Sequence, residues 1–140
     1  MIEQCAIAVS DLVGVPFVSG GRDIDGGLDC WGLVMIVMAR YGFTVPDFTV
    51  DAFAYKRIEE LANGAIMGRE WYEVFPPVEH PAVILLQVHP KYITHAAVYL
   101  DGDRFIHTTE KTGVVISDFR SPLNAMIRGF YKYAPHNKRT

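Results

Sequence analysis

The sequence predicts an α+β domain in which helices come first and an antiparallel sheet follows. Apolar residues recur at helical spacing near the N-terminus, and an almost wholly apolar segment follows a glycine-rich loop. After Pro81 the pattern changes to short β-rich runs separated by turn residues. Helices grouped before strands are typical of an α+β fold. With 140 residues, 50 % of them hydrophobic, and no repeat or linker, residues 1–140 are predicted to form one domain.

The first predicted helix rests on Ile2, Ala6, Val9 and Val13, which share one helical face until Gly14 stops the pattern. Cys5 lies beside this stripe and is interpreted as a small buried hydrophobic residue.

The second predicted helix spans Trp31 to Tyr41 and follows the glycine-rich loop from Ser19 to Gly27. Asp29 is a suitable N-cap, and Gly42 ends the segment. Because nearly every side chain in it is apolar, this helix is expected to be central and buried. A further helix is predicted from Tyr55 to about Met67.

Five strands are predicted after Pro81 from runs rich in β-branched and aromatic residues. They are Val83–Leu86, Thr94–Leu100, Arg104–Thr109, Val114–Ser117 and Phe130–Tyr133.

Charge and hydropathy exclude several classes of protein. Thirteen basic and sixteen acidic side chains give a net charge of −3, so no overall field favours nucleic acid or an anionic membrane. The longest apolar run, Leu33 to Ala39, is too short to span a bilayer. The first residues carry neither a basic segment nor a long apolar stretch, which predicts no secretory signal and synthesis in a cytoplasm. Two cysteines are too few for a disulfide scaffold, although a pair between Cys5 and Cys30 stays open.

The residue with the clearest chemical potential is Cys30, at the start of the buried helix. Free N–H groups and the helix dipole are expected to favour its thiolate there, which would make it a nucleophile if a base lies near. Alternatively, the cysteine is structural.

The candidate bases are His95 and His107, on adjacent predicted strands joined around Asp101-Gly102-Asp103. A three-residue loop would pair Leu100 with Arg104 and place both rings on one face, diagonal to each other. A two-residue loop would place them on opposite faces. Cys30 and the two histidines are also zinc-ligand types, but they lack the paired spacing that usually marks a zinc site.

Two blocks of sequence resemble a known family. The segment from Gly14-Val15-Pro16-Phe17 through Gly20-Gly21 to Asp29-Cys30-Trp31-Gly32-Leu33-Val34 resembles the nucleophile motif of the NlpC-type cell-wall cysteine peptidases, which are papain-like. The strands Thr94–Leu100 and Phe105–His107 resemble that family's base strand and third-residue strand. The resemblance covers roughly residues 10 to 135.

The resemblance implies an enzyme that hydrolyses an amide in the peptidoglycan stem peptide, typically between γ-D-glutamate and a diamino acid. Cys30 would be the nucleophile, His95 the base and His107 the residue that orients it, with no cofactor and no metal. The implied substrate-binding residues are Arg22, Asp23, Asp29 and Trp31; a solvated turn is the alternative for the two loop residues among them, Arg22 and Asp23. A related acyltransferase or amidase would use the same cysteine and histidines.

A subgroup is also suggested by the Asp29–Leu33 motif, the Gly20–Asp23 loop and the closing Arg128–Tyr131 segment. These are most similar to short members encoded in phage and gene-transfer-agent tail modules. The similarity implies assembly with tail-tip or hub proteins in the host cytoplasm and action at the cell wall.

Three positions depart from the residues that are common in the family. Phe17 stands where many members have tyrosine, Trp31 where serine is commoner, and His80-Pro81 where many members have Gly-Asp before the first core strand. The alternative is a structural tail-tip component without turnover.

Overall fold

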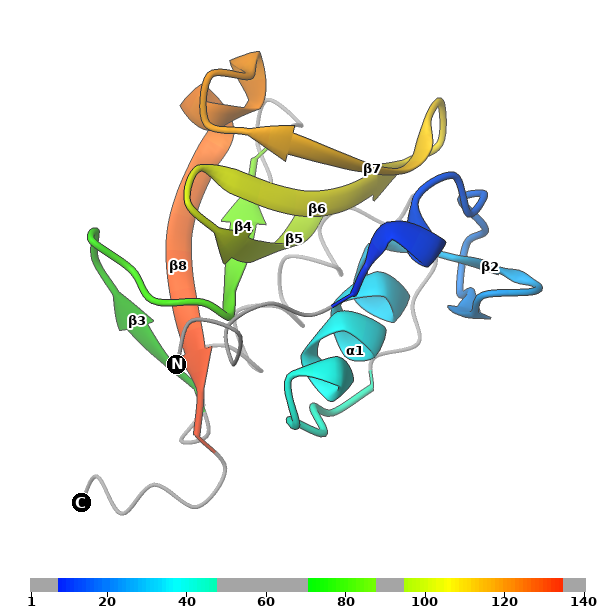
Figure 1. Ribbon diagram of the computed structural model, residues 1–140, viewed down its shortest axis with the longest axis horizontal. Helices are drawn as coiled ribbons and strands as arrows, with labels where there is room; N and C mark the ends of the chain where they lie inside the picture. Colours follow the sequence, from blue (N-terminus) through cyan, green and yellow to red (C-terminus); the bar gives the residue numbers. More distant parts are fainter. Residues whose placement is uncertain (1–7, 48–70, 88–94, 135–140) are drawn as a thin grey trace.

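In the part of the chain that the structure describes, one α-helix packs against a six-stranded antiparallel sheet (Figure 1). The computed structural model describes residues 8–47, 71–87 and 95–134. The helix α1 spans Cys30–Arg40 and contacts the middle of the sheet, chiefly β5. Among these residues, no helix is long and apolar enough to cross a membrane.

The strand order in the sheet is β3-β8-β4-β5-β6-β7. Its members are β3 (Trp71–Val74), β4 (Ala82–Leu86), β5 (His95–Asp101), β6 (Arg104–Thr109), β7 (Gly113–Asp118) and β8 (Ile127–Tyr133). All five predicted strands are therefore confirmed, with no end shifted by more than three residues. The sequence did not predict β3, which pairs with β8 at the edge of the sheet.

Both faces of the sheet are covered by apolar side chains. The cluster on the helix side includes Leu33 and Val37 of α1 together with Val83, Val98 and Ile106 of the sheet. The opposite face carries a second cluster around Ile84, Leu86, Ala97 and Phe105. Because β4 lies between the two clusters, all five of its residues are buried, which accounts for its unbroken apolar sequence.

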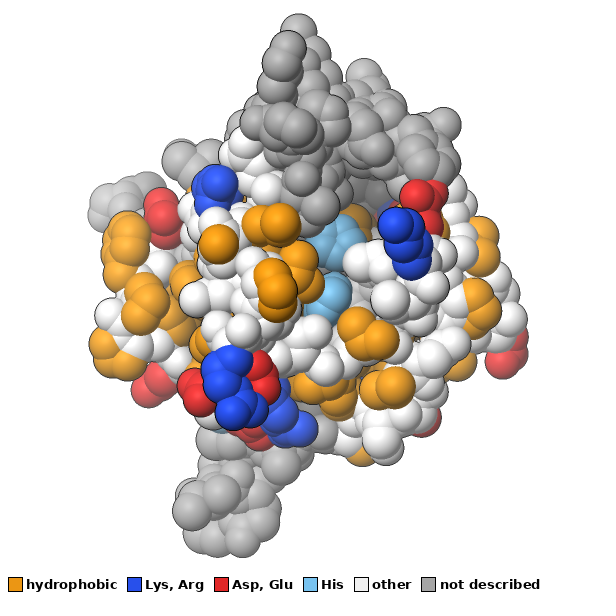
Figure 2. All heavy atoms as spheres, turned by 90° about the horizontal axis from the view of Figure 1, so that it is seen from above, with side chains coloured by type: hydrophobic (Ala, Val, Ile, Leu, Met, Phe, Trp, Pro, Cys, Tyr) orange, Lys and Arg blue, Asp and Glu red, His pale blue; other side chains and the backbone are white. Residues whose placement is uncertain are grey.

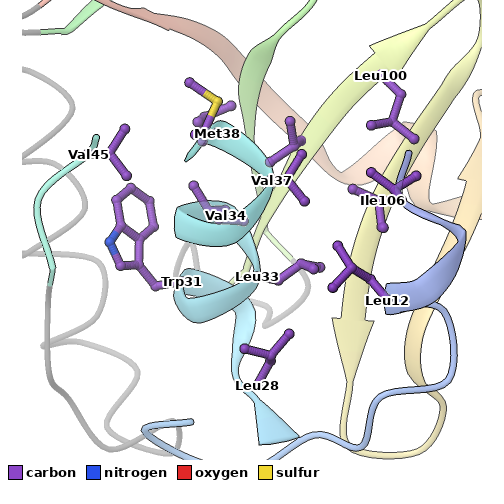
Figure 3. Packing of buried hydrophobic residues seen from close by; sticks show 14 of the residues in the cluster. Leu12, Leu28, Trp31, Leu33, Val34, Val37, Met38, Val45, Leu100 and Ile106 are labelled. Atoms are coloured by element: carbon purple, nitrogen blue, oxygen red, sulfur yellow. The ribbon is translucent and has the colours of Figure 1, made fainter. Parts of the chain in front are cut away.

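The helix α1 begins and ends one residue earlier than the predicted segment Trp31 to Tyr41. Asp29 is its N-cap and accepts a hydrogen bond from the backbone N–H of Gly32, while Gly42 adopts a φ of 98° after its end. Figure 3 shows Leu33 and Val37 directed toward Leu12 and Ile106, with Trp31 on another flank beside Val45. Ala39 is exposed, so the helix is buried on most of its surface rather than all round.

The predicted N-terminal helix is not found in the part of the chain that the structure describes. From residue 8 onward the segment forms only a short 3-10 helix, η2 (Ser10–Leu12). The chain then turns at Gly14 and pairs with β7, since Gly14 donates to the Val114 carbonyl and Val114 donates to that of Val15. Contact with the sheet thus replaces the last predicted helical turn. Cys5 and the predicted helix Tyr55–Met67 lie outside the described residues.

Candidate active site

Cys30 is the first residue of α1, and the residue before it organises the surrounding backbone. The Asp29 carboxylate accepts hydrogen bonds from the N–H groups of Gly20 (3.0 Å) and Gly32 (2.7 Å). It also pairs with the Arg22 guanidinium at 2.6 Å. One buried carboxylate therefore connects the glycine-rich loop to the first turn of the helix.

The backbone is packed so closely here that side chains are excluded at Gly21 in the loop and at Gly32 in the helix. A Cβ on Gly32 would collide with the carbonyl oxygen of Gly21, and a Cβ on Gly21 would collide with that of Gly27. The hairpin of β1 (Arg22–Asp23) and β2 (Gly27–Leu28) lies between Gly21 and Gly32 in the sequence and leads the chain directly to Asp29. These glycines are therefore required for the close approach of two backbone segments.

The expectation of a thiolate at Cys30 is corrected by its surroundings. Burial, followed by the neighbouring Asp29 carboxylate, raises the pKa of the Cys30 thiol to about 11. The backbone N–H groups of Ala96 and Trp31 and the charge of Arg22 act in the opposite direction but are outweighed. At neutral pH the side chain is a half-buried thiol.

The hydrogen bond from Ala96 places this thiol at the first residues of β5. The pairing between β5 and β6 begins at Val98 and Ile106, so Ala96 lies before the first pair. Its N–H is directed at the Cys30 sulfur instead. Ala96 directly follows His95, so the candidate nucleophile contacts the strand next to the candidate base.

Both histidines lie on the same face of the sheet, as the three-residue-loop alternative predicted, although the loop itself differs. Asp101 pairs with Arg104 across a two-residue turn, and a register shift between Tyr99 and Asp101 then pairs Val98 with Ile106. The extra residue in β5 is a β-bulge, and it restores the register that a three-residue loop would have given. The His95 and His107 rings meet edge to face with their centroids 5.8 Å apart.

Both imidazoles are neutral at pH 7. Burial, with a smaller contribution from His107, lowers the pKa of His95 to about 4, and burial also lowers the pKa of His107. The Nε2 atom of His95 and the Nδ1 atom of His107 are buried without a hydrogen-bond partner. Figure 2 shows histidine side chains near the centre of one face, bordered by hydrophobic side chains.

The four predicted substrate-binding residues all make contacts within the protein. Arg22 bridges Asp29 and Asp47, and Asp23 accepts from the N–H of Gly26 in the turn of the β1–β2 hairpin. The Trp31 indole donates to the carbonyl of Pro46 and packs against Trp71. These contacts explain the local structure, and substrate binding by these residues remains a prediction.

The structure adds three neighbours that the sequence analysis did not single out: Ala96, Asp47 and Ser117. Ser117 lies 2.9 Å from Nε2 of His107. Only the pairing of β6 with β7 brings it there, so no local sequence signal could have found it. Within the described ranges, no group of three or more His, Cys, Asp or Glu residues is placed so that it could hold a metal ion.

Comparison with solved structures finds the same fold in several NlpC/P60 proteins. A Staphylococcus aureus protein similar to lipoproteins of the NLP/P60 family matches with 21 % identity and a TM-score of 0.63, over 97 % of this chain and 40 % of that one. A Bacillus cereus NlpC/P60 family protein matches with 20 % identity and a TM-score of 0.62, over 89 % of this chain and 37 % of that one. The NlpC/p60 domain of peptidoglycan hydrolase SagA matches with 18 % identity and a TM-score of 0.54, over 94 % of both chains.

Similarity to these solved structures shows the fold. The chain spans about two fifths of the length of the first two proteins. The comparison with curated proteins found no match. A family model, by contrast, matches residues 14–127, which include Cys30 and both histidines. The chain therefore belongs to the NlpC/P60 family, whose members are cysteine peptidases and usually peptidoglycan hydrolases.

Proposed function

We propose that this protein is a cysteine peptidase that hydrolyses the amide between γ-D-glutamate and a diamino acid in peptidoglycan stem peptides. The observation that carries the proposal is the position of the Cys30 thiol. It starts a buried helix and contacts the backbone of Ala96, next to His95. A thiol at the backbone position next to a neutral histidine is suited to base-assisted attack on a carbonyl if the imidazole reaches the sulfur.

The reaction begins from a neutral pair, because Cys30 is protonated and His95 unprotonated at pH 7. As the sulfur attacks the scissile carbonyl, His95 takes the thiol proton and then delivers it to the leaving amine. A water molecule, deprotonated by His95, next attacks the thioester and releases the acid and the free thiol. The backbone N–H of Cys30 contributes to the oxyanion hole, where one donor is worth about 3 kcal/mol.

His107 holds His95 in the productive orientation. Its ring meets that of His95 edge to face with the centroids 5.8 Å apart, and Nε2 of His95 and Nδ1 of His107 are each without a hydrogen-bond partner. Catalytic hydrogen bonds often tighten only when substrate binds, and we expect these two atoms to form one at that stage.

The first experiment is mass spectrometry of muropeptides incubated with the reduced wild-type protein. A new product would identify the cleaved bond, and Cys30→Ala should yield none while remaining folded. Cys5→Ser is the matched control and should retain activity, since Cys5 has no part in the proposed mechanism. Cleavage by a folded Cys30→Ala variant would exclude Cys30 as the nucleophile.

We further propose that the protein acts at a phage-like tail tip, where it opens the cell wall locally and binds tail-tip or hub proteins. The support is the resemblance of the Asp29–Leu33 motif and the Gly20–Asp23 loop to tail-associated members. Detection of the chain in purified particles by mass spectrometry would support this location, and its absence from them would contradict it.

A catalytically silent structural component is the second candidate, and Phe17 favours it. This residue forms a backbone bridge with Leu28, two positions before Cys30, and lacks the hydroxyl that a tyrosine would bring there. If this candidate is correct, neither the folded wild type nor assembled particles will release a product. In that case Phe17→Tyr tests whether the hydroxyl alone restores cleavage.

A further inference from the structure

His107 occupies the middle of a diagonal line of polar side chains across three strands. Ser117 of β7 pairs with Phe105, so it lies on the face of the sheet that also carries the His107 ring. His95 of β5 approaches the same ring from the other side. The imidazole of His107 is therefore flanked by one polar group on each neighbouring strand.

The two nitrogen atoms of His107 have different surroundings. Nε2 lies 2.9 Å from the Ser117 hydroxyl oxygen, whereas Nδ1 is buried and has no hydrogen-bond partner. The ring also packs against Phe105, with centroids 5.3 Å apart, and only 3 % of the residue is exposed. The ring is thus held in place, and its remaining freedom is the choice of which nitrogen carries the proton.

That choice decides whether His95 can act as a base. If Nε2 of His107 carries the proton and donates to Ser117, Nδ1 keeps a free lone pair, which can accept from Nε2 of His95 once these two unpaired atoms come within hydrogen-bond distance. The lone pair of His95 is then on Nδ1, ready to take a proton. In the opposite tautomer the same approach would make His107 Nδ1–H the donor to His95 Nε2, so the proton of His95 would sit on Nδ1 and that atom would be no base.

We propose that Ser117 is a positioning residue, which accepts the Nε2 proton of His107 and so selects the tautomer that leaves His95 competent as a base. Its catalytic consequence rests on the proposed peptidase function, whereas the tautomer itself does not. Ser117 touches no reacting atom and acts only through His107.

The direct test is NMR of the histidine ring nitrogens in the full chain at pH 7, where His107 is neutral because burial lowers its pKa. The wild type should show a proton on Nε2 of His107 and a bare Nδ1. Ser117→Val should abolish this preference. Ser117→Thr should preserve it, because threonine has nearly the same shape as valine but keeps the hydroxyl of serine. A proton on Nδ1 in the wild type, or the same tautomer in the folded Ser117→Val variant, would overturn the proposal.

The kinetic test uses the same variants with a muropeptide substrate. Ser117→Val should lower kcat about tenfold with little change in KM, and Ser117→Thr should restore most of it. In a His107→Ala background, Ser117→Val should change kcat by about twofold or less, because the residue through which it acts is gone. An equal loss in both backgrounds would show that Ser117 acts by another route.

Ser121→Ala is the matched control. Its hydroxyl accepts from the N–H of Leu123 far along the chain from His107, and its loss should leave the tautomer and kcat unchanged. If the wild type releases no product but carries the Nε2 proton, the peptidase function fails while the assignment of the tautomer stands. The two failures are therefore distinguishable.

Discussion

The low pKa of His95 predicts a specific loss of stability in mild acid. A histidine in the unfolded chain has a pKa near 6.5, whereas burial, with a smaller contribution from His107, lowers that of folded His95 to about 4. Between these values the unfolded chain binds more protons than the folded one, so protonation favours unfolding as the pH falls. The contribution is complete above pH 6.5 and is lost progressively down to pH 4.

The size of the effect follows from the difference of 2.5 between 6.5 and 4. Linkage gives a loss of about 2 kcal/mol between pH 7.5 and pH 5, and about 3 kcal/mol by pH 4. These values are upper limits, because the residue is partly exposed and water screens the charge.

The assay is urea unfolding of the reduced protein, followed by tryptophan fluorescence. Trp31 and Trp71 are both buried, so their emission reports on the core. Each variant is compared with itself at pH 7.5 and pH 5, and His95→Gln removes the titrating ring while keeping a polar side chain. The wild type should lose about 2 kcal/mol more than His95→Gln. Equal losses in the two proteins would refute the assignment of this acid sensitivity to His95.

Three further predictions concern Cys30 and its supporting loop. In a Cys5→Ser background, iodoacetamide should modify Cys30 about a hundredfold more slowly at pH 7 than it modifies a reference thiol of pKa 9, because the thiolate fraction is about a hundredfold smaller. A modification rate equal to that of the reference thiol would contradict the pKa of about 11. Asp29→Asn should speed this alkylation, because a charge that raises the thiol pKa is removed, and should cost about 1–3 kcal/mol in urea unfolding. Gly32→Ala should cost at least about 2 kcal/mol, since its methyl group meets the Gly21 carbonyl, and unchanged unfolding would show that the loop can withdraw.

The sequence alone determined those features that depend on neighbours along the chain. The helix after Asp29 could be predicted because its cap, apolar side chains and terminal glycine are contiguous. The strands after Pro81 could be predicted for the same reason. The edge strand β3 was not predicted, because the strand it pairs with, β8, comes more than fifty residues later in the sequence. The helical prediction was wrong for residues 8 to 13, because their apolar spacing gave no sign that Gly14 and Val15 pair with β7.

For the site, the sequence identified Cys30, His95 and His107 as residue types suited to one reaction, but their relation depended on the tertiary structure. A loop length could not place the two histidines, because a bulge in β5 compensates for the two-residue turn. The helix start suggested a thiolate, whereas burial and the Asp29 carboxylate make Cys30 a thiol. The contact of Ser117 with His107 exists only through the pairing of β6 and β7. Residue types are local properties of a chain, whereas protonation states and hydrogen-bond partners depend on what distant segments bring to the same place.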